Sequence, residues 1–278
     1  MKVRKAVVTA AGPDHQLPLQ RLVDRQGTEK TALQLILDEV GQAGIEDTAL
    51  IVRPGDSAAF RTAAGDHAGR LTFIEQSSPR GYGDAIHRAR DFVGREPFLH
   101  LVGDHLYLSG DAERGCARQL VELAESENCS VSAVQATREN MLPYFGTVGG
   151  SRVARQNKLY EVTQVIEKPT PTEAEQKLHI AGLRAGYYLC FFGMHVLSPQ
   201  VMTLLSDAMD SSAKNIPLAT ALAGLAQRER YLAFEISGTR YNIGVKYGLL
   251  IAQLALALSG DDRDFMLTEM IQLLAEGK

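Results

Sequence analysis

The chain has 278 residues, of which 45% are hydrophobic and 22% are charged, and its formal net charge is -4 at pH 7. This length and composition allow one large α/β domain with a sizeable core. The negative charge and the lack of a block rich in Lys and Arg exclude nucleic acid as the main partner.

The cysteines and the apolar segments indicate where the protein works. Cys116, Cys129 and Cys190 are widely spaced and form no Cys-x-x-Cys pair, which is typical of a reducing compartment rather than of disulfides or zinc. The apolar run after Lys5 is too short for a signal peptide. The segment Tyr247–Leu258 is shorter than the roughly 18–20 residues that a membrane span needs. We therefore expect a soluble cytoplasmic protein with no membrane partner.

Strand-like runs alternate with helical stretches in the first half of the chain. The expected strands are Lys5–Thr9, Thr48–Val52, Leu71–Ile74, Phe98–Val102 and Ser130–Val134. The expected helices are Lys30–Ala43, Ser57–Ala64, Gly83–Val93 and Ala112–Ser126. This alternation indicates βαβ units, which build a mostly parallel central sheet with helices on both faces.

The second half lacks this alternation. Its strand-like runs without clear helices between them are Phe145–Gly149, Leu159–Ile166 and Ala185–Phe191. They predict a mixed-sheet extension of the parallel core. The later expected elements are a helix from Ser198, a helix Asn215–Gln227, a strand Leu232–Ile236, and two closing helices, Tyr247–Leu258 and Phe265–Leu274. The Pro/Glu-rich stretch from Glu167 to Gln176 is interpreted as a surface excursion, and no linker-like segment divides the chain.

Several short motifs follow one another along these elements. Asp104 ends the apolar run from Phe98, and Asn242 lies in Arg240-Tyr-Asn-Ile-Gly244, just before an expected helix. Between them come Tyr144-Phe-Gly146 and Glu167-Lys-Pro169, while Gln76 and Gly81 lie ahead of Asp104. Each motif is weak alone, but their shared order and spacing are specific.

This order resembles the sugar-phosphate nucleotidyltransferase family, most closely the UTP–glucose-1-phosphate uridylyltransferases, over nearly the whole chain. The resemblance implies a Rossmann-like nucleotidyltransferase fold in a single domain, residues 1–278. Residues 1–135 would form the nucleotide-binding half, and residues 136–278 the sugar-binding half with the C-terminal helices. The implied partners are a nucleoside triphosphate and a sugar 1-phosphate, and self-association into a homo-oligomer is expected because relatives usually form dimers or tetramers.

The implied reaction explains the residue types in the site. A sugar 1-phosphate oxygen attacks the α-phosphorus of the triphosphate, and pyrophosphate leaves. UTP is the nucleotide that the resemblance favours. Because two polyanions must meet, catalysis consists mainly of positioning and charge neutralisation.

The resemblance assigns nucleotide binding to Ala11, Gly12, Gln76 and Gly81. A Gln amide carries a donor and an acceptor and suits a pyrimidine edge, while a glycine allows close approach to the base. The alternative for the segment from Gln76 to Gly81 is an ordinary turn between a strand and a helix.

The sugar side of the site is assigned in the same way. Gly146 would offer its amide to a sugar hydroxyl, and Glu167 would accept hydrogen bonds from the sugar. Lys168 would contact the sugar phosphate and, with Asp104, would act in catalysis. The alternative for Glu167-Lys-Pro169 is a charged turn.

The resemblance also implies a Mg²⁺ site formed by Asp104 and Asn242. The family normally carries an aspartate at both positions, and magnesium prefers anionic oxygen ligands. A neutral Asn oxygen can bind the ion but neutralises less of its charge. We therefore expect a weakened magnesium site that depends more on the nucleotide phosphates.

The first loop departs furthest from the family pattern, which is a Gly-rich turn with a Thr-Arg pair and a later Pro-Lys pair. Pro13 removes a backbone N–H, Asp14 adds a negative charge, and no Pro-Lys pair follows. The cations Arg21, Arg25 and Lys30 could compensate only from shifted positions; the alternative is a solvated surface loop.

Two readings of the function therefore stay open. One is an active nucleotidyltransferase. The other is a catalytically degraded relative that binds a nucleotide or a sugar phosphate, or that acts as a regulatory or structural partner. A glycosyltransferase of the related fold would need an Asp-x-Asp at Asp104, and a dinucleotide-binding dehydrogenase would need a Gly-x-Gly-x-x-Gly after the first strand; the sequence has neither.

Overall fold

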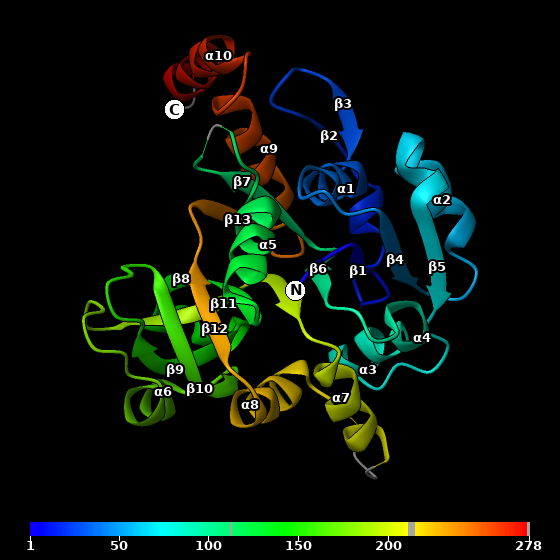
Figure 1. The fold of residues 1–278 in the computed structure, drawn as a ribbon. Coiled ribbons are helices and arrows are strands. Elements are labelled where there is room, and N and C mark those ends of the chain that lie inside the picture. Colours follow the sequence, from blue (N-terminus) through cyan, green and yellow to red (C-terminus); the bar gives the residue numbers. More distant parts are fainter. Residues whose placement is uncertain (112, 211–214, 277–278) are drawn as a thin grey trace.

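Nine strands form one continuous sheet in the computed structural model, which describes residues 1–111, 113–210 and 215–276 (Figure 1). In sheet order they are β5 (Leu71–Glu75), β4 (Asp47–Val52), β1 (Lys5–Thr9), β6 (Phe98–Val102), β11 (Tyr187–Leu197), β8 (Ser130–Arg138), β12 (Tyr231–Glu235), β10 (Leu159–Glu167) and β9 (Gly146–Arg152). The strands β5, β4, β1 and β6 are parallel, as predicted. The fifth strand expected in the first half, β8, lies instead in the mixed part of the sheet. The second-half strand β11 separates β8 from β6 and runs antiparallel to both.

Helices cover both faces of the sheet and bury its apolar side chains. One face packs against α1 (Ala32–Gln42), α2 (Ser57–Ala64) and α5 (Cys116–Glu127). The other packs against α3 (Tyr82–His87), α4 (Arg90–Val93), α7 (Gln200–Asp210) and α8 (Leu218–Arg228). Short 3-10 helices lie at Leu17–Leu19, Gly65–Arg70 and Glu139–Tyr144. The expected α/β architecture is thus confirmed; the first residue of the helix expected from Ala112 lies outside the described residues.

The start of α1 shows how the local sequence sets an element's bounds. The Thr31 hydroxyl accepts a 3.1 Å hydrogen bond from the Gln34 backbone N–H, and the Gln34 side chain accepts a 2.8 Å bond from the Thr31 N–H. This reciprocal capping box satisfies two backbone donors that a helix start leaves free. The chain then turns away at Gly44, whose φ of +77° suits glycine.

The far end of the sheet curls back on itself, because β9 pairs with β10 and also with β11. The close approach requires a glycine: a Cβ at Gly150 would lie 1.9 Å from the carbonyl oxygen of Glu161. A register shift in β10 between Val162 and Gln164 accompanies the bend. The curl thus brings the first residues of β9 alongside β11.

The bounds of one predicted helix are wrong. The helix expected over Gly83–Val93 is broken into α3 and α4, because the Ala89 N–H donates to the carbonyl of Ile86 in a tighter turn. The expected surface excursion contains helix α6 (Pro171–Lys177), which begins at Thr170 with a capping box closed by Glu173. Proline at the first turn and glutamate three residues after the cap favour a helix start there.

Two small antiparallel ribbons lie outside the main sheet. Strands β2 (Arg21–Val23) and β3 (Glu29–Thr31) form a hairpin just before α1. Strand β7 (His105–Ser109) follows β6 almost directly and pairs with β13 (Gly238–Asn242) from late in the chain. The β7–β13 ribbon lies between the two halves of the molecule (Figure 1).

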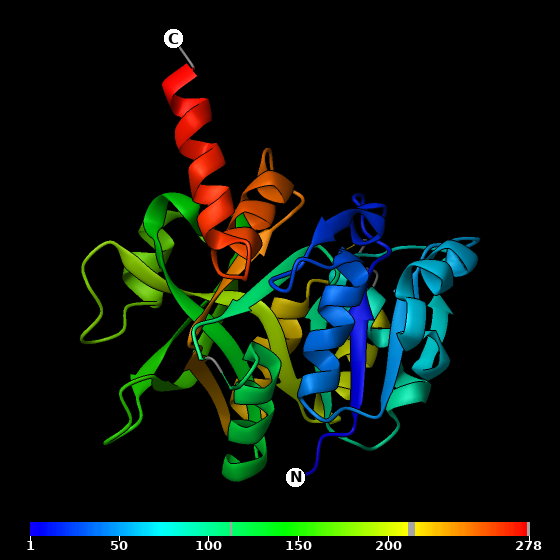
Figure 2. The same ribbon diagram turned by 90° about the horizontal axis from the view of Figure 1, so that it is seen from above.

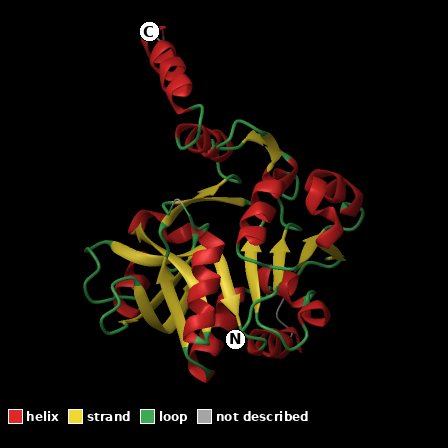
Figure 3. Ribbon diagram, turned by 45° about the horizontal axis from the view of Figure 1, so that its top comes forward, coloured by secondary structure: helices red, strands yellow, loops and turns green. Residues whose placement is uncertain are grey.

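The chain closes with α9 (Gly248–Leu258) and α10 (Arg263–Glu276), as predicted. Figures 2 and 3 show α10 projecting away from the body of the molecule. Its large apolar residues Phe265, Ile271 and Leu274 are 64%, 65% and 77% exposed. Within the described ranges, no helix combines the length and the apolar character needed to cross a membrane.

Candidate active site

The candidate site lies along the edge where the parallel strands end. Gln76 follows β5, Arg53 follows β4, Ala10 follows β1, and Asp104 comes two residues after β6. In open α/β sheets, ligands bind at this carboxyl edge, beside the point where the strand order reverses. Here that point lies between β1 and β6, so the first loop and Asp104 flank it. From β5 to β6 the edge spans roughly 14 Å, three interstrand steps of about 4.8 Å.

Asp104 lies in the tight turn between β6 and β7. Its side chain is 43% exposed, and its Oδ1 lies 2.7 Å from Nδ1 of His105. Burial alone would raise the pKa of Asp104, but the hydrogen bond and charge of His105 outweigh it, so the pKa lies below its usual range. Asp104 is therefore a carboxylate at neutral pH.

Asn242 lies beside Asp104, although 137 residues separate the two positions in the chain. It pairs with His105 across the β7–β13 ribbon, and the next N–H, of Ile243, donates to the Asp104 carbonyl at 2.9 Å. The Asn242 side-chain Oδ1 accepts a 2.8 Å bond from the Gly244 N–H. Asp14 of the first loop also borders this turn: a Cβ at Gly244 would lie 3.4 Å from its Oδ2.

The side-chain oxygens of Asp104 and Asn242 are suitable ligands for magnesium, but two side chains are too few to complete the coordination of the ion. Asp104 and Asn242 offer hard oxygen atoms, and a carboxamide oxygen with one hydrogen bond keeps a second lone pair. Across the described part of the chain, no three His, Cys, Asp or Glu side chains come together as a metal site. An ion held here would need further oxygen ligands, which nucleotide phosphates and water provide in many magnesium sites.

Arg53 holds the first loop in place, a role that the sequence analysis missed. Its Nε and Nη2 donate to the carbonyl oxygens of Ala11 and Gly12, at 3.1 and 2.7 Å. A Cβ at Gly12 would meet nothing within 4 Å, so this position is open. The sequence does contain a signal for this role, because Arg53 directly follows β4, the buried strand that pairs with β1.

The three cations considered as replacements for the lost phosphate-loop charges are engaged elsewhere. Arg21 pairs with Glu29 across the β2–β3 hairpin. Arg25 donates to the Ser259 carbonyl at 3.0 Å, near the end of α9. Lys30 forms ion pairs with Asp24 and Asp38. The alternative reading of this segment, as a surface loop, fits the contacts that these residues make.

Gln76 is 5% exposed, and its amide is held by a buried acid. Its Nε2 donates a 2.6 Å hydrogen bond to Oδ2 of Asp84, which is fully buried. Gly81 has a φ of +103°, and a Cβ there would lie 2.0 Å from Oδ1 of Asn215. In this structure the close approach that Gly81 permits is therefore made by Asn215.

The predicted sugar residues come together at the start of β9. Gly146 lies directly opposite Glu167 in the β9–β10 ladder, and a Cβ at Gly146 would lie 3.1 Å from the Glu167 Oε2. The Lys168 N–H donates to the Phe145 carbonyl at 3.2 Å. Although Glu167 is exposed, desolvation of its carboxylate raises its pKa, against the charge of Lys168.

Tyr82, at the start of α3, was not among the predicted site residues. Its hydroxyl bonds to Nε2 of His100 at 2.6 Å. Burial, and then the negative charges of Asp104 and Glu167, raise the pKa of Tyr82. The Tyr82 phenol therefore stays protonated at neutral pH. Its position directly after Gly81 was the only sequence signal.

Arg240 belongs to the motif Arg240-Tyr-Asn-Ile-Gly244, but the sequence predicted no role for its side chain. Its guanidinium carbon lies 3.8 Å from the centre of the Phe145 ring, and its buried Nη1 has no partner among the described residues. Burial lowers the pKa of Arg240 to about 10, so the side chain keeps its positive charge at neutral pH. This cation lies on β13, two residues before Asn242.

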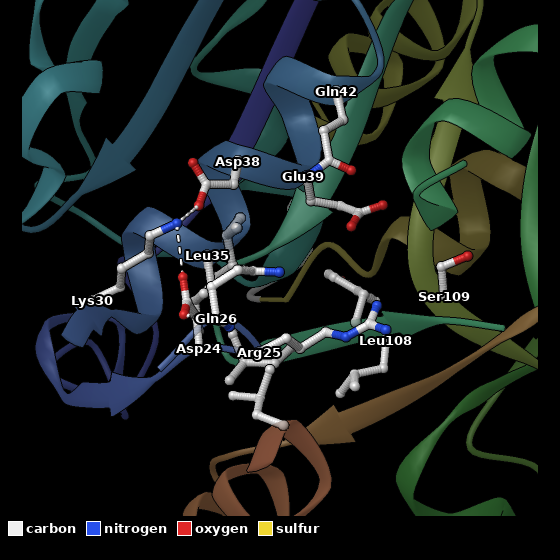
Figure 4. A pocket seen from close by; sticks show the side chains of 14 residues that line it. Asp24, Arg25, Gln26, Lys30, Leu35, Asp38, Glu39, Gln42, Leu108 and Ser109 are labelled. Carbon is white, nitrogen blue, oxygen red and sulfur yellow. Dashed lines mark hydrogen bonds and ion pairs between the residues drawn. The ribbon is translucent and has the colours of Figure 1, made fainter. Parts of the chain in front are cut away.

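A separate cavity of about 180 Å³ lies between α1, the β2–β3 hairpin, β7 and α9 (Figure 4). Lys30 crosses part of it and pairs with Asp24 at 3.1 Å and with Asp38 at 2.8 Å. Glu39 in its wall accepts a 2.6 Å hydrogen bond from the Ala117 N–H. The residues around this cavity do not include Asp104 or Asn242.

Comparisons with known proteins show the family to which this sequence is related. Residues 20–241 match the family described as nucleotidyl transferase. A UTP–glucose-1-phosphate uridylyltransferase of Streptococcus pneumoniae is 27% identical, over 98% of this chain and 96% of the relative. The enzyme of the same name from Staphylococcus epidermidis is 25% identical, over 98% of this chain and 99% of the relative.

Solved structures share the fold. A UDP-glucose pyrophosphorylase complexed with UDP-glucose superposes with a TM-score of 0.75 at 22% identity, covering 91% of this chain and 98% of the other. The UDP-glucose pyrophosphorylase of Acinetobacter baumannii gives a TM-score of 0.76 at 20% identity, covering 98% and 99%. The family match begins after Gly12 and ends one residue before Asn242.

Proposed function

Because this chain belongs to the nucleotidyl transferase family, we propose that it transfers UMP from UTP to a sugar 1-phosphate, with release of pyrophosphate. One observation carries the proposal: the candidate groups stand in the order that the reaction needs. Gln76 lies at one end of the carboxyl edge, the open Gly12 loop lies at β1, and Asp104 lies at β6. Glu167 lies directly opposite Gly146 in the β9–β10 ladder, with Lys168 next to it in the chain.

The residues divide the work of binding and positioning. Gln76 would bind the base, and the amides near Gly12 would approach the phosphates. Gly146 and Glu167 would hold the sugar, while Lys168 would neutralise its phosphate. An oxygen of that phosphate attacks the α-phosphorus, and the bond to the bridging oxygen of pyrophosphate breaks. Bringing the two substrates together accounts for much of such a rate enhancement.

Asp104 and Asn242 are the residues that we propose to hold Mg²⁺. When bound, the ion would offset the negative charge that gathers on the phosphates. Asp104 contributes the only carboxylate of this pair, so binding is expected to require the nucleotide as well. The donor chemistry of the two side chains supports this assignment.

A second function is favoured by specific contacts. Arg21 and Arg25 are engaged away from the cleft, and position 242 carries an amide. These features favour a protein that binds a nucleotide or sugar phosphate with slow turnover. Each missing charge contact at a transition state can be worth about 3 kcal/mol.

One experiment separates the two functions. The protein is incubated with UTP, glucose 1-phosphate and Mg²⁺, and pyrophosphate release is measured against an Asp104→Asn control. Turnover at ordinary enzyme rates that the control loses supports the transferase. If pyrophosphate is not released but UTP or glucose 1-phosphate raises the unfolding temperature, the binding function is favoured. If neither ligand shifts the unfolding temperature, both functions are contradicted.

The cellular location and the oligomeric state of the protein are also proposals. Three free cysteines support the cytoplasm. The exposed apolar residues Leu250, Ile251 and Leu273, on α9 and α10, support self-association through these helices. Sedimentation analysis at several concentrations tests this, and a monomer at all of them would contradict it.

A further inference from the structure

Asp84 is a fully buried acid at the start of α3 with three hydrogen-bond donors around it. Its Oδ2 accepts from Gln76 Nε2 at 2.6 Å and from the Arg80 N–H at 3.1 Å. Its Oδ1 accepts from Nε of Arg88 at 3.2 Å. Charge-assisted bonds of this kind are stronger than neutral ones. The carboxylate therefore has a fixed position beside Gln76.

This contact decides which way the Gln76 amide faces. A carboxylate can only accept hydrogen bonds, whereas a Gln amide has one end that donates and one that accepts. The donating end must therefore face Asp84. Within the described ranges, no residue donates to the Gln76 Oε1, so the accepting end has no protein partner there.

We propose that Asp84 is a positioning residue that fixes Gln76 with its accepting oxygen toward the base, so that the site selects a pyrimidine with a ring N–H at position 3. This inference rests on the proposed function, because it assumes that Gln76 contacts the base. Uracil and thymine carry that N–H. The N3 atom of cytosine carries no hydrogen and is itself an acceptor. It would face the Gln76 oxygen, and neither of these two acceptors would have a donor.

Asp84 also anchors its own loop, through Arg80 and Arg88, so a purely structural role must be distinguished from positioning. A loop anchor affects the binding of all nucleotides alike. An amide-orienting residue affects the ratio of affinities for UTP and CTP. This ratio is therefore the quantity to measure, together with the unfolding temperature of each variant.

The test measures dissociation constants of UTP, CTP and N3-methyl-UTP with Mg²⁺ by calorimetry. Wild-type protein should bind UTP at least about tenfold more tightly than either analogue, because each leaves the Gln76 oxygen without its donor. In Asp84→Asn the new amide can donate to Gln76 and let it turn. The preference for UTP over CTP should then fall about tenfold or more.

A rescue variant and a matched control complete the design. In the double variant Gln76→Glu with Asp84→Asn, the residue at position 76 again only accepts, and the UTP preference should return. Asp111 is the matched carboxylate, since it too accepts from an arginine Nε, that of Arg114 at 2.9 Å, and from a backbone N–H. Asp111→Asn should leave the ratio unchanged.

The outcomes separate this inference from the proposed function. Equal wild-type affinity for the three nucleotides overturns the inference and leaves nucleotide binding intact. An unchanged UTP preference in Asp84→Asn, or a rescue variant that does not regain it, also overturns it. If Asp84→Asn unfolds, the inference is tested by two other measurements. These are the UTP preference of the double variant and the affinity of the wild type for N3-methyl-UTP, and the loss of either expected result overturns the inference. If the wild type binds no nucleotide, both the inference and the proposed function fail.

Discussion

The backbone N–H of Ile243 donates a 2.9 Å hydrogen bond to the carbonyl of Asp104. This bond ties the turn that carries Asn242 to the turn that carries the acid, so their side chains belong to one small region. Because this bond joins backbone atoms, the side chain of residue 242 can be replaced without removing it.

Asn242→Asp should restore a second carboxylate. The new side chain can still accept from the Gly244 N–H, so the local turn is kept. The Mg²⁺-dependent affinity for UTP should rise by about tenfold, because an anionic oxygen replaces a neutral one. Titration calorimetry with Mg²⁺ or with chelator measures it. Asn157→Asp adds the same charge at an exposed site and should change nothing. An unchanged affinity at position 242 would exclude this region from metal binding.

Gly12→Ala tests the first loop. No atom lies within 4 Å of the new Cβ, so the free energy of unfolding should change by less than about 0.5 kcal/mol. If phosphates approach this backbone, the methyl group should weaken UTP binding several-fold. Gly69→Ala is the matched control, since its Cβ is also unopposed. Equal UTP affinity in both variants would place the triphosphate away from Gly12.

Gly146→Ala should damage the sugar side selectively. Its Cβ would lie 2.8 Å from the Phe191 ring and 3.1 Å from the Glu167 carboxylate, so these groups must shift. Overpacking of this kind costs about 1–3 kcal/mol of stability. Affinity for glucose 1-phosphate should fall while affinity for UTP is kept. Glu167→Gln removes the charge without the clash and should also weaken glucose 1-phosphate binding. Equal losses for both ligands would argue against a sugar-specific role.

Glu39→Gln tests a buried carboxyl. Burial raises the pKa of Glu39, and the N–H groups of Ala117 and Cys116 only partly oppose it. The native state thus binds this proton more tightly than the unfolded chain does. Stability should therefore fall as pH rises from about 4.3 through the folded pKa. A glutamine can still accept from Ala117, and it should remove this fall. Urea unfolding between pH 4 and 7 measures the slope, with Glu122→Gln as the exposed control. An unchanged slope would contradict the prediction.

His195→Gln tests the opposite pH response. His195 is 2% exposed, stacks on His100 and bonds to Ser132 at 2.6 Å. Burial lowers the pKa of His195 well below its usual value and that of His100 to about 4. The unfolded chain binds these protons first, so stability is lost as pH falls below about 6.5, by about 1.4 kcal/mol per pH unit for each histidine. The variant should reduce this slope by the share of one histidine, about 1.4 kcal/mol per pH unit.

The control for that measurement is His179→Gln, which replaces an exposed histidine. It should leave the slope between pH 6.5 and 4 as it is in the wild type. A His195 variant with the wild-type slope would contradict the assignment of the acid response to this buried pair.

The sequence predicted the parallel strands because each is a short, nearly continuous apolar run between helical stripes. It did not predict β13, since Gly238-Thr-Arg-Tyr-Asn242 has little apolar pattern and forms a strand only by pairing with β7. It missed α6 because its proline and glutamate content resembles a loop, and the capping signal at Thr170 was overlooked.

The site was predictable where a residue type follows a recognisable strand, as with Asp104 and Gln76. It was not predictable where a partner is distant in sequence. Nothing near Arg25 indicates that its partner is the Ser259 carbonyl, and nothing near Gln76 requires that Asp84 hold its amide. The roles of these residues in binding stay predictions until ligands are tested.

The β7–β13 ribbon joins a strand from the middle of the chain to one from its last sixth. During synthesis, β1, β4, β5 and β6 can leave the ribosome and pair long before residue 238 is made. Asp104 would then wait without its neighbour Asn242. The order of translation therefore makes the β7–β13 ribbon, and with it the placement of Asn242 beside Asp104, a late step in the assembly of the fold.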